Sequence, residues 1–184
     1  MKIKYGIDLG TTNSGIAKMN QGESFIIKNS FQKDTTPSCI SFTKNKGIRV
    51  GDQAYNQLQM DKLLSLKKDG YISNCFIEFK RTMGSDKKYY SSHMEKEFSS
   101  EELSAEVLKN LKSITQEDDL KSVVITIPAL FNQNQMTSTI NAAKLAGFAQ
   151  VKLLMEPIAA AMAYGLDKKV SNGKILMFDF GGGT

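Results

Sequence analysis

The feature that most limits the fold of this chain is the order of its apolar runs and helical segments from residue 99 onward. Residues 121–127 contain the apolar run VVITI, which Pro128 ends, and residues 151–155 and 175–180 form two further short apolar runs. Segments with helical features lie between these runs. Strands that alternate with helices pair in parallel, and the helices pack on the faces of the sheet. The second half of the sequence therefore predicts an α/β fold.

The helical segments have recognisable ends. Residues 99–114, SSEELSAEVLKNLKSI, open with serine followed by acidic residues, which is typical of a capped helix start. Apolar side chains then recur on one helical face, at Leu103, Val107, Leu108 and Leu111. Residues 132–146 predict a second helix that stops at Gly147. Residues 156–165 predict a third, in which Pro157 suits the first turn.

The first part of the sequence has the shorter period of β-strands. Runs at residues 3–9, 14–19 and 24–28 are separated by the turn sequences LGTTN and NQGE, which predicts an antiparallel meander. Residues 38–43 and 48–51 predict a hairpin with KNKG as its turn. We expect the meander and the parallel strands to form one mixed sheet.

The middle of the sequence is less regular. Residues 52–68 have apolar residues at roughly helical spacing and predict a helix. Residues 85–100 are polar, contain tyrosine and lack a clear period, which predicts an exposed connection or a loosely formed helix. Cys39 and Cys75 lack C-x-x-C spacing, so we interpret them as reduced thiols without a chemical role.

Composition excludes several classes of protein. The 184 residues are 41% hydrophobic and 23% charged, which is too apolar for an intrinsically disordered chain, and no uncharged run approaches the length of a membrane span. No secretory leader is indicated. The net charge of +5 comes from scattered lysine pairs, which are more typical of solvated loops than of a nucleic-acid site. We therefore expect a cytoplasmic protein that binds neither nucleic acid nor membrane.

Two glycine-rich turns follow apolar strands that end in aspartate. In GIDLGTTNSG the strand ends at Asp8, and MFDFGGGT repeats the plan with Asp179. The turn residues are Gly10, Thr11, Thr12 and Asn13 in the first stretch and Gly181, Gly182, Gly183 and Thr184 in the second. Taken alone, the first turn is equally well explained as a tight turn with a hydrogen-bonding asparagine. The repetition favours two turns whose N–H groups and hydroxyls hold a polyphosphate, with both aspartates facing Mg²⁺ through its waters.

The second turn is not a P-loop, because the sequence contains no GxxxxGK[ST] motif. Nine stretches follow one another along nearly the whole chain: GIDLGTTNSG, TPSCISF, VGDQA, FKRTMGS, LSAEVLKNLK, VVITIPALFN, AAKLAGF, EPIAAAMAYGLD and FDFGGGT. Together they resemble the amino-terminal lobe of the ATPase domain of the 70-kDa heat-shock chaperone family. Sugar kinases and actins share the two phosphate turns with this family, but not FKRTMG or EPIAAAMAYGLD. The short segment between FKRTMGS and LSAEVL resembles a specialised bacterial heat-shock-cognate branch.

The resemblance implies a ribonuclease-H-like fold of the actin-like ATPase kind, with a mixed sheet flanked by helices and a smaller inserted subdomain. It assigns residues 1–34 and 103–170 to the core subdomain and residues 35–102 to the insertion. Residues 171–184 would be the first strand and phosphate loop of a second lobe. Family members continue with that lobe, a linker and a peptide-binding β-sandwich. We therefore expect this chain to be nearly inactive alone, and its last strand to pair with an exposed edge of this lobe or of a neighbouring copy.

The resemblance also implies roles for three residues. Lys80 would reach the γ-phosphate of ATP and position the attacking water, Glu156 would order Mg²⁺ or that water, and Pro128 would report the nucleotide state. By local pattern alone, Lys80 is a solvated surface lysine, Glu156 a helix N-cap and Pro128 the end of a strand. Phosphoryl transfer depends mostly on positioning and charge, so Lys80, Glu156 and Mg²⁺ with backbone donors are a sufficient chemical set.

The expected function is ATP hydrolysis, with ADP as the product, that regulates the binding of unfolded peptides by the full-length protein. Partners implied by the resemblance are a J-domain co-chaperone and a nucleotide-exchange factor. Met136 and Lys152 stand where the main chaperones usually carry arginines used in interdomain and J-domain contacts, and Leu130 replaces a tyrosine. Two alternatives stay open: a small-molecule kinase of the actin superfamily, and a scaffold that senses nucleotide without hydrolysing it.

Overall fold

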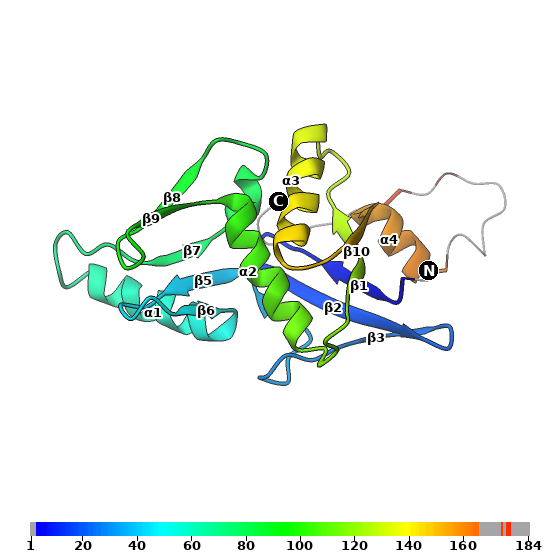
Figure 1. The fold of residues 1–184 in the computed structure, drawn as a ribbon, viewed down its shortest axis with the longest axis horizontal. Coiled ribbons are helices and arrows are strands. Elements are labelled where there is room, and N and C mark those ends of the chain that lie inside the picture. Colours follow the sequence, from blue (N-terminus) through cyan, green and yellow to red (C-terminus); the bar gives the residue numbers. More distant parts are fainter. Residues whose placement is uncertain (1–2, 166–173, 175, 178–184) are drawn as a thin grey trace.

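The computed structural model describes residues 3–165, 174, 176 and 177, and its largest element is a mixed sheet (Figure 1). The strand order is β11-β10-β1-β2-β3, with β4 beside β2. The strands are β1 (Tyr5–Asp8), β2 (Asn13–Asn20), β3 (Glu23–Ile26), β4 (Thr36–Pro37), β10 (Ser122–Ile127) and β11 (Gln150–Met155). Strand β2 pairs antiparallel with β1 and β3, whereas β10 pairs in parallel with β1 and β11. The predicted meander, the parallel pairing of the strands at residues 121–127 and 151–155, and the mixed sheet are confirmed.

Strand β1 lies in the middle of the sheet, between β10 and β2, and its side chains alternate between the two faces. Tyr5 and Ile7 are buried on one face, and Asp8 is exposed on the other. Ile7 lies opposite Ile16 of β2 and Ile125 of β10, and all three are buried. Such a row of branched side chains across three strands gives the sheet one apolar face.

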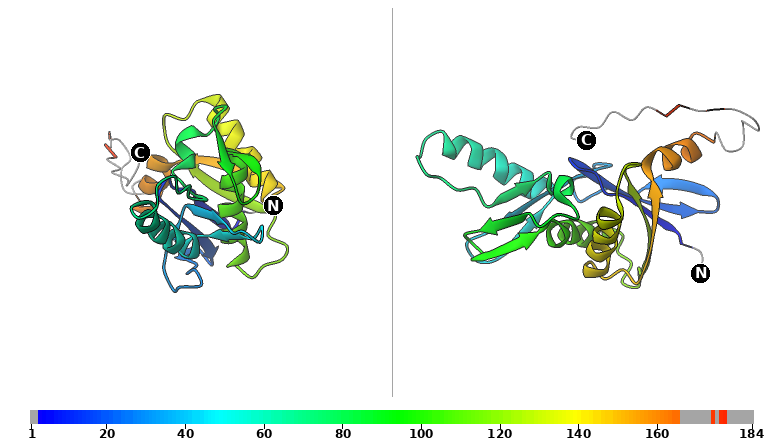
Figure 2. Two further views of the ribbon diagram at one scale, coloured as in Figure 1. Left: turned by 90° about the vertical axis from the view of Figure 1, so that its left-hand side faces the viewer. Right: turned by 90° about the horizontal axis from the view of Figure 1, so that it is seen from above.

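Helices cover both sides of this sheet. They are α2 (Ser100–Ser113), α3 (Gln133–Leu145) and α4 (Glu156–Ala163). Figure 2 shows α2 and α3 on one side of the sheet and α4 on the other. A capping box begins both α2, through Ser99 and Glu102, and α3, through Asn132 and Gln135. The side chains predicted for the apolar face of α2 are all buried: Leu103, Val107, Leu108 and Leu111.

A second sheet of order β6-β5-β7 lies beside the main sheet, with helix α1 against it (Figure 1). Its elements are β5 (Cys39–Phe42), β6 (Ile48–Val50), α1 (Asp52–Ser65) and β7 (Cys75–Ile77). The predicted hairpin and helix are confirmed, whereas β7 had no clear sequence signal. Ile40 and Phe42 of β5 belong to the same buried cluster as Ile7 and Leu103. The two sheets therefore share one apolar core.

The prediction for residues 85–100 is wrong. This segment is neither an exposed connection nor a helix but a hairpin of β8 (Lys88–Ser91) and β9 (Lys96–Ser99). Phe98 is buried, and its ring stacks on that of Phe42 with 4.4 Å between the centroids. The ring of Tyr89 meets that of Phe76 edge-on at 5.9 Å. Two aromatic side chains attach this hairpin to partners on other strands, so its stability is not visible as a periodic pattern in residues 85–100.

Helix α1 carries a buried carboxylate. Asp61 is 4% exposed and accepts hydrogen bonds from Gln57 Nε2 at 2.7 Å, from the Tyr71 hydroxyl at 2.9 Å and from the Ser73 hydroxyl at 2.6 Å. The Cys75 thiol donates to the same carboxylate at 3.4 Å. Burial raises the pKa of Asp61, but these hydrogen bonds outweigh burial and hold the pKa below its ordinary value. The network attaches α1 to the segment that leads into β7.

Part of the carboxyl-terminal prediction lies outside the described residues, namely Asp179 and the turn formed by Gly181, Gly182, Gly183 and Thr184. Of the strand predicted over residues 175–180, Leu176 and Met177 are described, and neither belongs to a strand. The pairing of that segment, self-association and the subdomain boundaries stay predictions. Within residues 3–165, no helix has the length and apolar character needed to cross a membrane.

Candidate functional site

The first predicted phosphate turn begins at the carboxyl end of the central strand. Asp8 is the last residue of β1 and is exposed. Its Oδ1 accepts a hydrogen bond from the Thr126 hydroxyl at 2.8 Å, and Thr126 lies opposite Asp8 in the parallel pairing with β10. The other carboxylate oxygen accepts no hydrogen bond from the described part of the chain. Asp8 is therefore fixed at the sheet edge with one oxygen open.

Close packing of backbone on backbone requires glycine at position 10. A Cβ on Gly10 would lie 2.0 Å from the carbonyl oxygen of Asn13. Two serines support the turn: the Gly10 N–H donates to the Ser14 hydroxyl at 3.1 Å, and the Ser38 hydroxyl donates to the Gly10 carbonyl at 2.7 Å. Because the Ser38 proton is used there, Ser14 donates across the 2.8 Å between the two hydroxyls. Thr12 and Asn13 remain exposed on the outer side of the turn.

Lys80 and Glu156 are 76 residues apart in the sequence and form an ion pair in the structure. Lys80 Nζ lies 2.9 Å from Glu156 Oε1, and the two side chains are 5% and 22% exposed. Lys80 belongs to the 3₁₀ turn η1 (Phe79–Thr82), and Glu156 is the first residue of α4. Both local interpretations are wrong. Lys80 is buried rather than solvated, and the N-cap position of α4 belongs to Met155.

The parallel strands bring Asp8 and Glu156 to one edge of the sheet. Asp8 lies opposite Thr126 of β10, and Ile127 lies opposite Met155 of β11. Glu156 therefore follows at once after the paired region. Two strand spacings, about 10 Å, separate the strand that ends at Asp8 from the strand that leads into Glu156. Ligands of open α/β sheets bind at the carboxyl ends of the strands, where these two carboxylates lie.

Pro128 begins a turn that reaches Lys80. The Phe131 N–H donates to the Pro128 carbonyl at 3.2 Å. Lys80 Nζ lies 5.5 Å from the centre of the Phe131 ring, within the range of a cation–π contact. Leu130, in the same turn, is 96% exposed. Pro128 is thus connected to Lys80 through one turn and one ring, while its role as a switch stays a prediction.

The ammonium of Lys80 has hydrogen-bonding capacity that the described protein does not use. An ammonium carries three N–H donors, and that of Lys80 donates one hydrogen bond, to Glu156. Burying a charge without such partners is unfavourable. Two donors of a 5% exposed lysine therefore have no acceptor among the described residues, at the sheet edge that also carries Asp8. An anion rich in oxygen would satisfy them.

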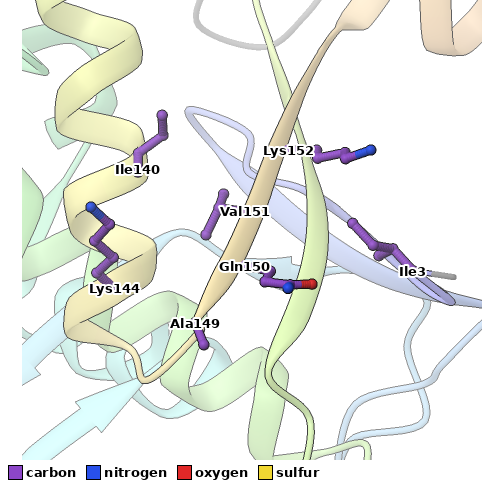
Figure 3. A pocket seen from close by; sticks show the side chains of 7 residues that line it. All are labelled: Ile3, Ile140, Lys144, Ala149, Gln150, Val151 and Lys152. Atoms are coloured by element: carbon purple, nitrogen blue, oxygen red, sulfur yellow. The ribbon is translucent and has the colours of Figure 1, made fainter. Parts of the chain in front are cut away.

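A cavity of about 390 Å³ lies elsewhere, between α3 and β11 (Figure 3). It is lined by Ile3, Ile140, Lys144, Ala149, Gln150, Val151 and Lys152. Figure 3 shows Lys144 and Lys152 on opposite sides of β11. Because β11 starts at Gln150 and ends beside Glu156, this cavity is at the opposite end of the strand from the Lys80 pair. It is not part of the site described above.

Four supporting residues escape sequence reasoning. Ser14 and Ser38 hold the Gly10 turn, Thr126 holds Asp8, and Phe131 faces Lys80. Ser14 begins the predicted strand of residues 14–19, and Thr126 lies near the end of the predicted strand of residues 121–127. Their positions in these strands could therefore have placed them near the Gly10 turn and Asp8. Nothing in the sequence relates Ser38 or Phe131 to their partners.

The sequence matches a known protein family along nearly its whole length. The family model described as "Hsp70 protein" matches residues 4–184. The chain belongs to the Hsp70 family. Relatives named "Chaperone protein DnaK" are 42% identical in Thermosipho melanesiensis, 39% in Mycoplasmopsis agalactiae and 38% in Prochlorococcus marinus. These alignments cover 97%, 100% and 97% of this chain, so the Hsp70 resemblance predicted from the motifs is confirmed.

This Hsp70 chain spans 29 to 30% of the length of those relatives. The matched region differs in length between two of them: the alignment with the Thermosipho melanesiensis relative runs over 183 residues and that with the Prochlorococcus marinus relative over 203. Length in this region therefore varies among Hsp70 relatives with the same name. Membership of a specialised bacterial heat-shock-cognate branch stays a prediction, and the short segment between FKRTMGS and LSAEVL does not support it by itself.

Proposed function

We propose that this Hsp70 chain forms part of the Mg-ATP site of a chaperone ATPase, on a ribonuclease-H-like, actin-like fold. The observation that carries the proposal is the buried Lys80 ammonium, two of whose donors have no acceptor among the residues that the structure describes, at the same sheet edge as Asp8. Phosphate oxygens are suitable acceptors for such donors. The strand order and the family match support the fold assignment.

The residues present fit a nucleotide with its metal ion. Gly10 leaves the turn free of a side chain that would fill it, so the exposed Thr12 and Asn13 can approach phosphate oxygens. One carboxylate oxygen of Asp8 accepts no hydrogen bond from the described part of the chain, and Asp8 would hold hydrated Mg²⁺ through its waters. Bound Mg²⁺ would offset part of the phosphate charge. Asp179 and the turn from Gly181 to Thr184 would complete this arrangement.

In hydrolysis, Lys80 would act on the γ-phosphate and Glu156 on the attacking water. The ammonium would donate to the γ-phosphate and stabilise charge as it develops there. The Glu156 carboxylate, which is 22% exposed, would accept a hydrogen bond from the attacking water and orient it. The ion pair between them fixes both groups before nucleotide arrives, and such fixed positions favour phosphoryl transfer.

In the full-length protein this site would regulate the binding of unfolded peptides, as the name of the relatives, "Chaperone protein DnaK", suggests. Pro128 would transmit the nucleotide state, because its turn carries the ring that contacts Lys80. A J-domain co-chaperone and a nucleotide-exchange factor would be its partners. We further propose residues 1–34 with 103–170 as the core subdomain and residues 35–102 as the insertion.

The test is single-turnover ATP hydrolysis and calorimetric Mg-ATP binding by the full-length protein carrying Lys80→Ala. We expect hydrolysis to fall at least about a hundredfold, because a positioned charge at the reacting phosphate is lost. Lys44→Ala is the matched control, since Lys44 is exposed in the turn between β5 and β6. Unchanged hydrolysis in Lys80→Ala would remove Lys80 from the mechanism. Turnover by the 184-residue chain equal to that of the full-length protein would refute the expected near-inactivity of the chain alone.

A further inference from the structure

One hydroxyl, that of Thr82, connects the turn that carries Lys80 to two neighbouring elements. Thr82 Oγ1 donates to the Phe79 carbonyl at 3.0 Å, which closes the 3₁₀ turn on either side of Lys80. The same oxygen lies 2.7 Å from the Tyr89 hydroxyl and 2.7 Å from the Ser100 hydroxyl. Three elements therefore meet at a single atom: η1, the β8–β9 hairpin and the start of α2.

The chemistry of a hydroxyl fixes the direction of these bonds. A threonine hydroxyl has one proton and two lone pairs. Its proton goes to Phe79, so Thr82 accepts from both Tyr89 and Ser100. All three capacities are used, and Ser100 is only 2% exposed. Replacing the hydroxyl with a methyl group would leave two buried or half-buried donors without a partner.

No other polar side chain among the described residues joins η1 to both neighbours. Phe79 and Met83 anchor the turn by apolar burial, at 2% and 3% exposure. Apolar packing keeps the turn against the core but does not specify the orientation of its backbone, because the hydrophobic effect is not directional. The hydroxyl contacts at Thr82 are directional and lie two residues from Lys80.

We infer that Thr82 is a positioning residue for Lys80, acting with Tyr89 and Ser100. The inference rests on the proposed function of Lys80 and gives a role to the hairpin of residues 88–99. Tyr89 is in turn fixed by its edge-on contact with Phe76. The hairpin thereby holds the ammonium in the orientation that faces Glu156.

Thr82→Val, which keeps the shape and removes the hydroxyl, tests the inference in the full-length protein. We expect kcat for ATP hydrolysis to fall about tenfold while KM changes less than about twofold, because the lysine is misplaced only at the reacting phosphate. Thr82→Ser restores the hydroxyl and should return kcat to within about twofold of wild type. Thr139→Val is the matched control, since Thr139 is 1% exposed and its hydroxyl donates to the Gln135 carbonyl within α3.

A second measurement does not depend on catalysis. Amine acetylation of the 184-residue chain, followed by mass spectrometry, reports how far Lys80 is shielded at its present 5% exposure. Thr82→Val should raise acetylation of Lys80 several-fold relative to wild type and to Thr139→Val. Wild-type labelling and wild-type kcat in a folded Thr82→Val protein would overturn the inference. Raised labelling with unchanged hydrolysis in both Thr82→Val and Lys80→Ala would instead refute the proposed function and leave the positioning role intact.

Discussion

Substituting Gly10 with alanine tests the proposed phosphate-binding role of the turn after β1. The Cβ of alanine at position 10 would lie 2.0 Å from the Asn13 carbonyl oxygen, a distance that real Cβ atoms essentially never show. Reaching even 3.0 Å requires a movement of about 1 Å in backbone. Asn13 pairs with Pro37 of β4, so it cannot move alone.

The expected magnitude follows from that movement. Forcing an extra methyl group into a packed site typically costs about 1–3 kcal/mol. The same shift would move the exposed N–H and hydroxyl groups of Thr12 and Asn13 away from any bound phosphate. A displacement of about 1 Å can reduce reaction rates a hundredfold. We expect Gly10→Ala to weaken Mg-ATP binding at least tenfold in the full-length protein and to lower the unfolding midpoint.

Gly6→Ala, in the strand β1 that leads into this turn, is the matched control. A Cβ at Gly6 meets nothing within 4 Å, so it should leave nucleotide binding unchanged and slightly raise stability. The assays are calorimetric titration with Mg-ATP and thermal unfolding followed by circular dichroism. Nucleotide binding by Gly10→Ala equal to that of Gly6→Ala would refute the role of backbone proximity in this turn.

Two further predictions concern the second sheet. The pKa of Asp61 in the folded chain lies below its ordinary value of 3.8, so Asp61 contributes stability that is present above about pH 4 and lost as pH falls through the lower folded value. Urea unfolding of Asp61→Asn should therefore show a smaller loss of stability between about pH 7 and pH 2 than wild type, and an identical loss would contradict this. Burial raises the pKa of Cys39 to about 12 and that of Cys75 to about 11. Iodoacetamide at neutral pH should accordingly modify both thiols far more slowly in the native than in the denatured chain, as followed by mass spectrometry, and equal rates would contradict their assigned environment.

The parts of the fold that sequence predicted well have local causes. The capping residues Ser99 and Asn132 lie within three residues of the groups they bond. The VVITI run and the apolar face of α2 carry their own periodicity. By contrast, the β8–β9 hairpin depends on Phe42 and Phe76, on other strands, and its own alternation is too short to be recognised.

In the candidate site, too, some features follow from local sequence and others from the fold. The sequence by itself determined the strand that ends at Asp8 and the glycine-rich turn after it, because both follow from residues in one short stretch. The close approach of the Asn13 carbonyl, which requires glycine at position 10, is seen only in the folded chain. Local pattern was misleading for Lys80, which looked like a surface lysine until Glu156 and Phe131 were placed against it. Only the tertiary structure could decide this, because strand pairing and chain crossover bring together residues that are 76 positions apart. Charge is tolerated inside a protein when a partner is present, and that partner is a property of the fold.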